Sequence, residues 1–168
     1  MNIFPKLGLF FLLGIIACKD VTKHKPDPTE SVQITIDEVK LISLTDQPVS
    51  MKQYKDKTVF INFWASWCKP CLEEMPSIQK AMGTLKDENI VFLFASEETP
   101  VQIEEFKRSH GYPFQFVRAE SLAELNVLAL PTTFIFNKQG IRAFSEMGYR
   151  KWDDKTNIDL ITKIARQE

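Results

Sequence analysis

Hydrophobic residues in the middle of the chain follow two different patterns. Residues 58–64 and 90–95 are almost continuously apolar and rich in β-branched and aromatic side chains, which is typical of strands covered on both faces. Between them, apolar residues recur every three or four positions and predict a helix that ends near residue 87; they are Leu72, Met75, Ile78, Met82 and Leu85. This order predicts a βαβ unit with parallel strands.

The remaining pattern extends this unit on both sides. Partial alternation at 32–44 predicts one or two strands of an extra N-terminal β-hairpin. The elements predicted after residue 100 are a helix at 101–110, a strand at 114–117, a helix at 121–125 capped by Ser121, strands at 132–136 and 141–147 joined by a turn at 137–140, and a helix at 153–166. The fold class is therefore α/β, with a central mixed β-sheet flanked by helices.

The first 17 residues have the pattern of an export signal. Lys6 adds positive charge beside the amino terminus, and residues 7–17 carry no charged or hydrogen-bonding side chain. This run is far shorter than the roughly 20 apolar residues of a membrane-spanning helix. We predict a signal peptide at 1–17, with a buried helix of the domain as the alternative.

The end of this run resembles the lipobox of bacterial lipoproteins, because Ile-Ile-Ala precedes Cys18. The resemblance implies that Cys18 is acylated and holds the protein on a membrane, since each buried methylene contributes about 0.8 kcal/mol. An ordinary cleavable signal with an incidental cysteine is the alternative. Residues 18–31 are polar and contain Pro26 and Pro28, which predicts a lipid anchor and flexible tether before a domain at 32–168.

Charge and cysteine content narrow the function. A net charge of -1 without a cluster of Lys and Arg argues against nucleic-acid binding. Of the three cysteines, Cys18 is assigned to lipid, which leaves Cys68 and Cys71 as a pair. A loop this short stabilises a fold poorly as a disulfide, so redox or metal chemistry is the better interpretation of the pair.

The pair lies where the strand at 58–64 passes into the following helix. Unpaired amides and the macrodipole at a helix N-terminus stabilise an anion, and Lys69 acts in the same direction, so Cys68 is predicted to ionise readily. Pro70 suits the first helical turn. Cys71 is predicted to be the more buried cysteine. Cys68 would then attack a substrate disulfide, and Cys71 would resolve the mixed disulfide.

The stretch F-W-A-S-W-C-K-P-C resembles the thioredoxin active site, and the pattern from about Val39 onward resembles the membrane-anchored TlpA/ResA branch of that superfamily. The resemblance implies a thioredoxin-like fold. It also places Glu74 and Pro76 at the positions of a glutamate and a helix-kinking proline. Leu130, Pro131 and Thr132 resemble the loop whose proline is cis and lies against the cysteines.

Glu74 and Asn62 bear on how a proton could be transferred to or from the cysteines. Glu74 follows Cys71 by three residues and lies on the same helix face, so it can exchange a proton with Cys71, and burial would raise its pKa. Asn62 stands six residues before Cys68, where cytosolic thioredoxin has a buried aspartate, and asparagine cannot titrate. The alternative for Glu74 is an exposed helix carboxylate.

Substrate contacts are predicted at the same end of the domain. A cis bond before Pro131 would leave the backbone of Leu130 free to pair with an extended substrate segment, with Thr132 beside it. Trp67 is predicted to cover the active-site surface, whereas Trp64 is predicted to be core or a pocket wall.

These features together predict a thiol-disulfide oxidoreductase that uses no cofactor or metal beyond the Cys68–Cys71 couple. The resemblance implies a reductant of protein disulfides outside the cytoplasm, on the periplasmic or extracytoplasmic side, in cytochrome c maturation or similar thiol maintenance. A reductant in an oxidising compartment needs a membrane electron donor, which the resemblance implies to be of the CcdA/DsbD type.

Three alternatives belong to other classes. A copper carrier on this fold uses C-x-x-x-C spacing and a distant histidine, whereas this chain has C-x-x-C and only His24 and His110. A peroxiredoxin-type peroxidase needs Thr-x-x-Cys in its first helix, which is not found. A non-catalytic binding module would not require the placement of two cysteines at a helix start.

Overall fold

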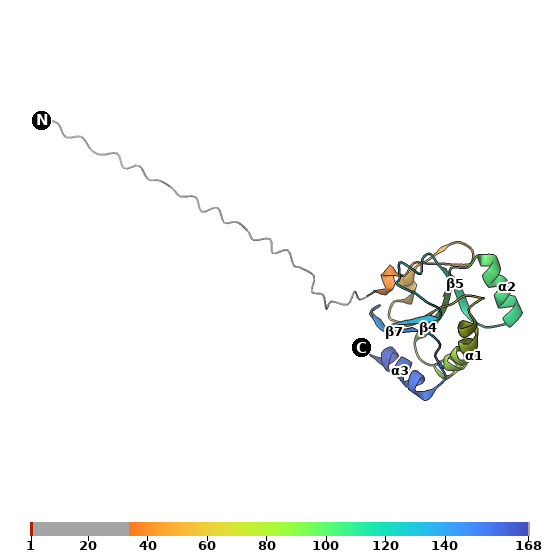
Figure 1. The fold of residues 1–168 in the computed structure, drawn as a ribbon. Coiled ribbons are helices and arrows are strands. Elements are labelled where there is room, and N and C mark those ends of the chain that lie inside the picture. The colour runs from red at the N-terminus through yellow and green to blue at the C-terminus, as the bar shows by residue number, and fades with distance from the viewer. Residues whose placement is uncertain (2–33, 168) are drawn as a thin grey trace. The chain divides into compact units, whose positions relative to one another are not determined.

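The computed structural model describes Met1 and residues 34–167. Residues 34–167 form one mixed sheet with α helices packed against it (Figure 1). The elements are η1 (Ile36–Glu38), β1 (Leu41–Ile42), β2 (Pro48–Val49), η2 (Met51–Tyr54), β3 (Thr58–Phe63), α1 (Lys69–Thr84), β4 (Ile90–Ser96), α2 (Pro100–His110), β5 (Gln115–Ala119), β6 (Thr132–Phe136), β7 (Arg142–Met147) and α3 (Lys155–Arg166).

The sheet has seven strands in the order β2-β1-β5-β4-β3-β6-β7. The three central strands β5, β4 and β3 are parallel, and β6 and β7 continue the sheet in antiparallel pairing. The predicted βαβ unit and C-terminal hairpin are therefore confirmed, and so is the central mixed sheet. Because β3 is central and its residues are all buried, its C-terminal end is a fixed point from which α1 begins.

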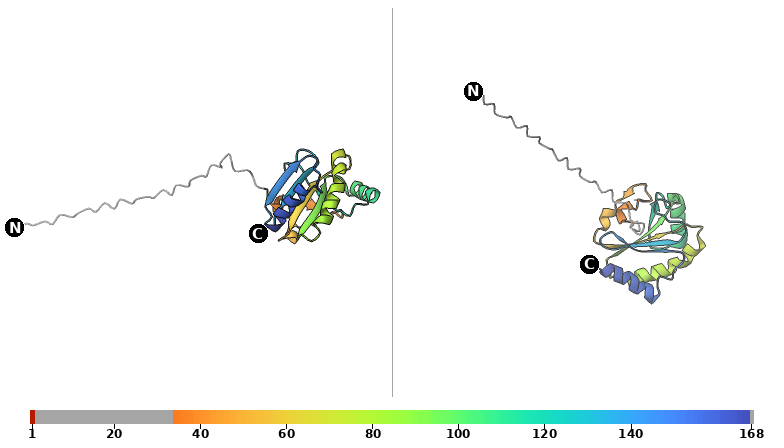
Figure 2. Two further views of the ribbon diagram at one scale, coloured as in Figure 1. Left: turned by 90° about the horizontal axis from the view of Figure 1, so that it is seen from below. Right: turned by 60° about the vertical axis from the view of Figure 1, so that its left-hand side comes forward.

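The two faces of the sheet are covered by different parts of the chain. Side chains of β3, and Trp64 directly after it, alternate between the two faces, so that Phe60 and Trp64 pack with the helices while Val59 and Phe63 pack on the opposite face. All three α helices contribute to the first face, and α1 and α3 lie along it in Figure 2. The opposite face is covered by the segment before β3 and by the loop between β5 and β6.

The N-terminal hairpin is present but lies later than the alternation suggested. Strands β1 and β2 pair antiparallel, and β1 also pairs with β5 at the sheet edge. Residues before β1 form an isolated bridge between Thr35 and Ile141 and then the short η1. The apolar residues of this segment are buried against the sheet face. Their burial does not require them to pair as strands.

The predicted helix at 121–125 is wrong. Ser121 does accept a hydrogen bond from the Glu124 amide, as a cap does, but the chain forms only turns. Asn126 adopts φ 56°, and the Val127 amide returns to the Leu122 carbonyl. A single left-handed residue ends a helix, so the apolar residues here are buried by a turn.

The predicted signal peptide, Cys18 lipidation and tether lie outside the described residues. Among residues 34–167, no helix is long and apolar enough to span a membrane.

Candidate active site

Cys68 is the N-cap of α1. Its φ and ψ of -83° and 93° are extended, and its Sγ accepts a hydrogen bond from the Cys71 amide at 3.3 Å. The amide of Cys68 itself donates to the Ala65 carbonyl, which fixes the turn between β3 and the helix. The sulfur therefore lies at the helix end where backbone amides and the macrodipole favour negative charge.

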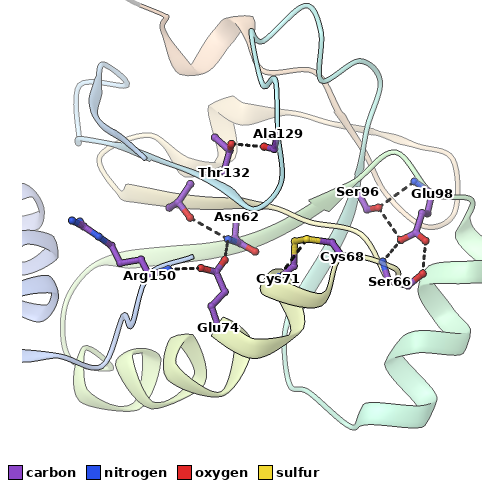
Figure 3. Close-up of a disulfide and its surroundings, with 11 residues drawn as sticks. Asn62, Ser66, Cys68, Cys71, Glu74, Ser96, Glu98, Ala129, Thr132 and Arg150 are labelled. Atoms are coloured by element: carbon purple, nitrogen blue, oxygen red, sulfur yellow. Dashed lines mark hydrogen bonds between the residues drawn. A yellow bond between two sulfur atoms is a disulfide. The ribbon is translucent and has the colours of Figure 1, made fainter. Parts of the chain in front are cut away.

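Cys68 and Cys71 form a disulfide, with their Cα atoms 5.3 Å apart (Figure 3). Cys71 is fully buried, and Cys68 keeps 4% of its surface exposed. The order of burial is the predicted one, but the difference is small, because both cysteines belong to the same buried core cluster.

The residues around the pair differ in exposure. Trp67 is 75% exposed beside Cys68, so it forms surface next to the disulfide. Lys69 is the first residue of α1, and its ammonium lies in solvent 3.8 Å from Glu73, which offsets part of its charge. Pro70 lies in the first turn as predicted. Pro76 is exposed within α1, which continues through it.

Glu74 is a fully buried carboxylate one turn after Cys71. Both project from the same side of α1, and the Glu74 side chain extends toward Asn62 (Figure 3). Its Oε1 accepts a hydrogen bond from Asn62 Nδ2 at 2.7 Å, and its Oε2 accepts one from the Arg150 amide at 3.2 Å. The predicted alternative, an exposed helix carboxylate, is wrong.

Burial raises the pKa of Glu74 from 4.5 to about 7, and the hydrogen bonds from Asn62 and Arg150 oppose this rise. The indole N–H of Trp152 also favours the charged form, although it lies outside hydrogen-bonding geometry. A carboxyl group with this pKa is both a proton donor and a proton acceptor near neutral pH.

Asn62 links the carboxylate to the sheet. Its Nδ2 also donates to Thr133 Oγ1 at 3.1 Å, so one amide joins α1 to β6 through β3. Its Oδ1 is buried and has no hydrogen-bond partner among the described residues. Because the side chain of Asn62 cannot ionise, Glu74 is the titratable member of this hydrogen-bonded pair.

In the loop before β6, Leu130 packs against the core cluster that contains both cysteines. The Leu130–Pro131 bond is cis, and Pro131 is buried while Leu130 is half-buried. Thr132 begins β6, and its Oγ1 donates to the Ala129 carbonyl at 2.7 Å (Figure 3). Within residues 34–167, neither the amide nor the carbonyl of Leu130 makes a backbone hydrogen bond. Its backbone is therefore free to pair with an extended segment of another chain.

One group near the disulfide was missed by the sequence analysis. The Glu98 carboxylate accepts hydrogen bonds from the Ser66 amide, the Ser66 hydroxyl and the Ser96 hydroxyl (Figure 3). It thereby ties the end of β4 to the loop that carries Cys68. A usable signal was present, because Glu97 and Glu98 directly follow a buried parallel strand, and such strand ends gather functional side chains.

No group of three or more His, Cys, Asp or Glu side chains within residues 34–167 is placed to hold a metal ion. The ring of His110 stacks on Phe106, and its Nδ1 contacts the Phe106 carbonyl at the C-terminal end of α2. Ala65 stands three residues before Cys68, where a Thr-x-x-Cys motif would place threonine. The described residues thus give no specific support to a copper carrier or a peroxiredoxin-type site.

The sheet order, the Cys-x-x-Cys disulfide at the start of α1 and the cis-proline loop beside it define a protein of the thioredoxin-like class. A family model described as the AhpC/TSA family matches residues 32–143. The chain belongs to this family.

Named relatives and a solved structure agree with this placement. The thiol-disulfide oxidoreductase ResA of Geobacillus kaustophilus is 32% identical over 137 residues, which cover 79% of each chain. ResA of Bacillus thuringiensis subsp. konkukian is 30% identical over 101 residues, and the chain spans 58% of the length of that relative. The crystal structure of the pneumococcal exposed lipoprotein thioredoxin (Etrx1) from Streptococcus pneumoniae has the same fold, with a TM-score of 0.61 and 22% identity over 74% of this chain and 96% of that chain.

Proposed function

We propose that this protein is a thiol-disulfide oxidoreductase that exchanges the Cys68–Cys71 couple with protein substrates. The observation that carries the proposal is the position of Cys68 as the N-cap of α1, bonded to Cys71, which itself lies one turn before the buried carboxyl group of Glu74. The relatives named ResA support the same activity. The couple itself carries the two electrons, so the reaction needs no further cofactor or metal.

In the reducing direction, the Cys68 thiolate attacks one sulfur of a substrate disulfide. A mixed disulfide forms, and the other substrate sulfur leaves as a thiolate. Cys71 then attacks the Cys68 sulfur, which closes the Cys68–Cys71 disulfide and releases the second substrate thiol. The substrate gains two electrons and the protein loses two. The reverse sequence oxidises a substrate dithiol.

Glu74 serves as the proton acceptor for Cys71 in the second step. Cys71 is fully buried, so its proton needs an acceptor inside the protein, and the ionised form of Glu74 supplies one on the same helix face. With a pKa of about 7, Glu74 loses its own proton as the pH rises through neutrality. The rate of the second step is therefore expected to rise over this range.

Trp67, Leu130, Pro131 and Thr132 form the substrate-binding surface in this proposal. Trp67 offers an exposed ring beside Cys68, and Leu130 offers unpaired backbone groups next to the cis bond. An extended substrate segment that pairs with Leu130 brings its sulfur toward Cys68 through backbone hydrogen bonds.

We propose further that the protein acts outside the cytoplasm, held on a bacterial membrane by acylated Cys18. The export pattern at 1–17 and the lipobox-like end of that run support this, and the solved neighbour from Streptococcus pneumoniae is itself described as an exposed lipoprotein. In that location the protein works as a reductant, in cytochrome c maturation or similar thiol maintenance. Its Cys68–Cys71 disulfide is reduced again by a membrane electron donor of the CcdA/DsbD type.

Two cysteine variants test the chemistry and the location separately. The reduced protein should accelerate insulin reduction, and Cys68→Ser should abolish the acceleration. Cys18→Ser is the matched control, because it removes a cysteine outside the couple and should keep full activity in solution while losing the membrane-bound fraction in cells. Activity in Cys68→Ser would refute Cys68 as the nucleophile, and membrane retention of Cys18→Ser would refute the lipid anchor.

A further inference from the structure

A pocket of about 250 Å³ is lined by Trp67, the residue that precedes Cys68 in the chain. Its apolar walls come from the loop before Cys68, the β5–β6 loop and the cis-proline loop, and they include Trp64, Trp67, Leu122 and Leu130. Its other end is formed by Glu97 and Glu98 after β4, and no Lys or Arg lines it. The pocket therefore combines an apolar surface with negative charge.

The two carboxylates of this pocket differ in their hydrogen bonds. Both oxygens of Glu98 accept hydrogen bonds from protein groups, which are provided by Ser66 and Ser96. Glu97 is exposed, and one of its oxygens accepts from the Leu122 amide at 2.8 Å. No donor among residues 34–167 contacts its other oxygen. Glu97 thus offers a free negative charge at the pocket rim.

Trp64 closes the apolar wall of the pocket. It is fully buried, and its indole Nε1 has almost no accessible surface, so this nitrogen is out of reach of a bound substrate.

The loops that form the pocket also expose large apolar side chains to solvent. Trp67 lines the pocket and is 75% exposed, and Leu128, two residues before Leu130, is 74% exposed. Leu130 itself lines the pocket and has free backbone groups. An extended polypeptide paired with Leu130 therefore passes over the pocket opening and can insert a side chain into it.

We infer that this pocket selects substrates that carry a large aliphatic residue next to the reacting cysteine and a Lys or Arg facing Glu97. The inference rests on the proposed function, and it specifies the class of substrate for the same site. Apolar walls favour the aliphatic side chain by removing its surface from water. The uncompensated carboxylate favours a cationic neighbour and disfavours an acidic one.

Four synthetic peptides test the inference, each closed by one intramolecular disulfide. The residue before the first cysteine is Leu or Ser, and the residue two positions before that one is Lys or Glu, because alternate residues of an extended segment share a face. The rate constant for oxidation of the reduced, full-length protein is measured with each peptide at low and high salt. Leu should exceed Ser by about tenfold, as expected for burial of an aliphatic side chain. Lys should exceed Glu by roughly two- to fivefold, the size of one partly exposed ion pair, and high salt should reduce this ratio.

Variants assign these preferences to the pocket. Glu97→Gln keeps an acceptor for the Leu122 amide but removes the charge, so the Lys-over-Glu preference should disappear while the Leu preference stays. Glu124→Gln is the matched control, because it removes the same charge from a β5–β6 loop residue that pairs with Lys40 and does not line the pocket. Trp67→Ala should reduce the Leu preference, and its exposed position leaves the core intact.

The outcomes separate the inference from the proposed function. If the protein reduces none of the peptides, the oxidoreductase function itself is refuted. If it reduces all four at equal rates, the function stands and the pocket inference is overturned. A Lys preference that persists in Glu97→Gln would overturn the assignment to Glu97.

Discussion

Replacing Glu74 by glutamine should remove a large pH dependence from the stability of the oxidised protein. Glu74 is fully buried, and its pKa is raised from 4.5 to about 7, chiefly by burial. A raised carboxyl pKa means that the folded protein holds the neutral form more tightly than the unfolded chain does. The resulting stability is fully present below pH 4.5 and is lost as the pH rises through about 7.

The magnitude follows from the two pKa values. At about 1.4 kcal/mol per pH unit, a rise from 4.5 to about 7 corresponds to a loss on the order of 3 kcal/mol between acidic and alkaline solution. The amide side chain of the Glu74→Gln variant cannot ionise and loses nothing over this range. The substitution is also sterically mild, because rotation of the Asn62 amide would turn its unpartnered Oδ1 toward the new amide group.

Urea unfolding of the oxidised wild type and Glu74→Gln across pH 4 to 9 measures this effect. Other titratable groups contribute equally to the two free energies of unfolding, so their contributions cancel when the wild-type value is subtracted from that of the variant. This difference should shift in favour of the variant by about 3 kcal/mol as the pH rises. Glu73→Gln is the control, because Glu73 is an exposed neighbour on the same helix, and its difference curve should be nearly flat. A flat curve for Glu74→Gln, or one of opposite sign, would refute the raised pKa.

Three further substitutions test the site. Cys71→Ser should accumulate a mixed disulfide between Cys68 and substrate, detected by mass spectrometry, and an adduct at any other residue would contradict the assigned roles. Asn62→Ala removes the hydrogen bond that lowers the pKa of Glu74, so the pH midpoint of substrate reduction should move upward; an unchanged or lower midpoint would contradict the contact. Glu98→Ala leaves the donors of two serines unpaired and should lower the free energy of unfolding by about 1–3 kcal/mol in urea titrations; a neutral result would mean that the loop before Cys68 is held by other contacts.

The central fold was predictable because its pattern is local and strong. The strands at 58–63 and 90–96 are almost continuously apolar, and the helix between them has apolar residues three or four positions apart, so the types of these elements follow from the pattern. The 121–125 segment carries Leu122 and Leu125 three positions apart, as a helix does, but it is followed by the left-handed Asn126, and its leucines are buried against the sheet face that the segment covers. Periodicity over one turn does not distinguish these two outcomes.

The site was predictable where a single element carries it. Cys68, Cys71 and Glu74 share one helix, so their relative positions follow from helical geometry. The Arg150 amide and Glu98 reach the site from distant parts of the chain through tertiary packing. The strand-end carboxylates carried a signal of their position, but their serine partners could be identified only from the fold.

The most direct test of the account is a single-turnover reaction between the fully reduced protein and a peptide disulfide, with the products mapped by mass spectrometry. The account predicts that the Cys68–Cys71 disulfide forms as two peptide thiols appear, through an intermediate in which the peptide is bonded to Cys68. A peptide adduct on Cys71, or peptide thiols that appear without formation of this disulfide, would contradict it.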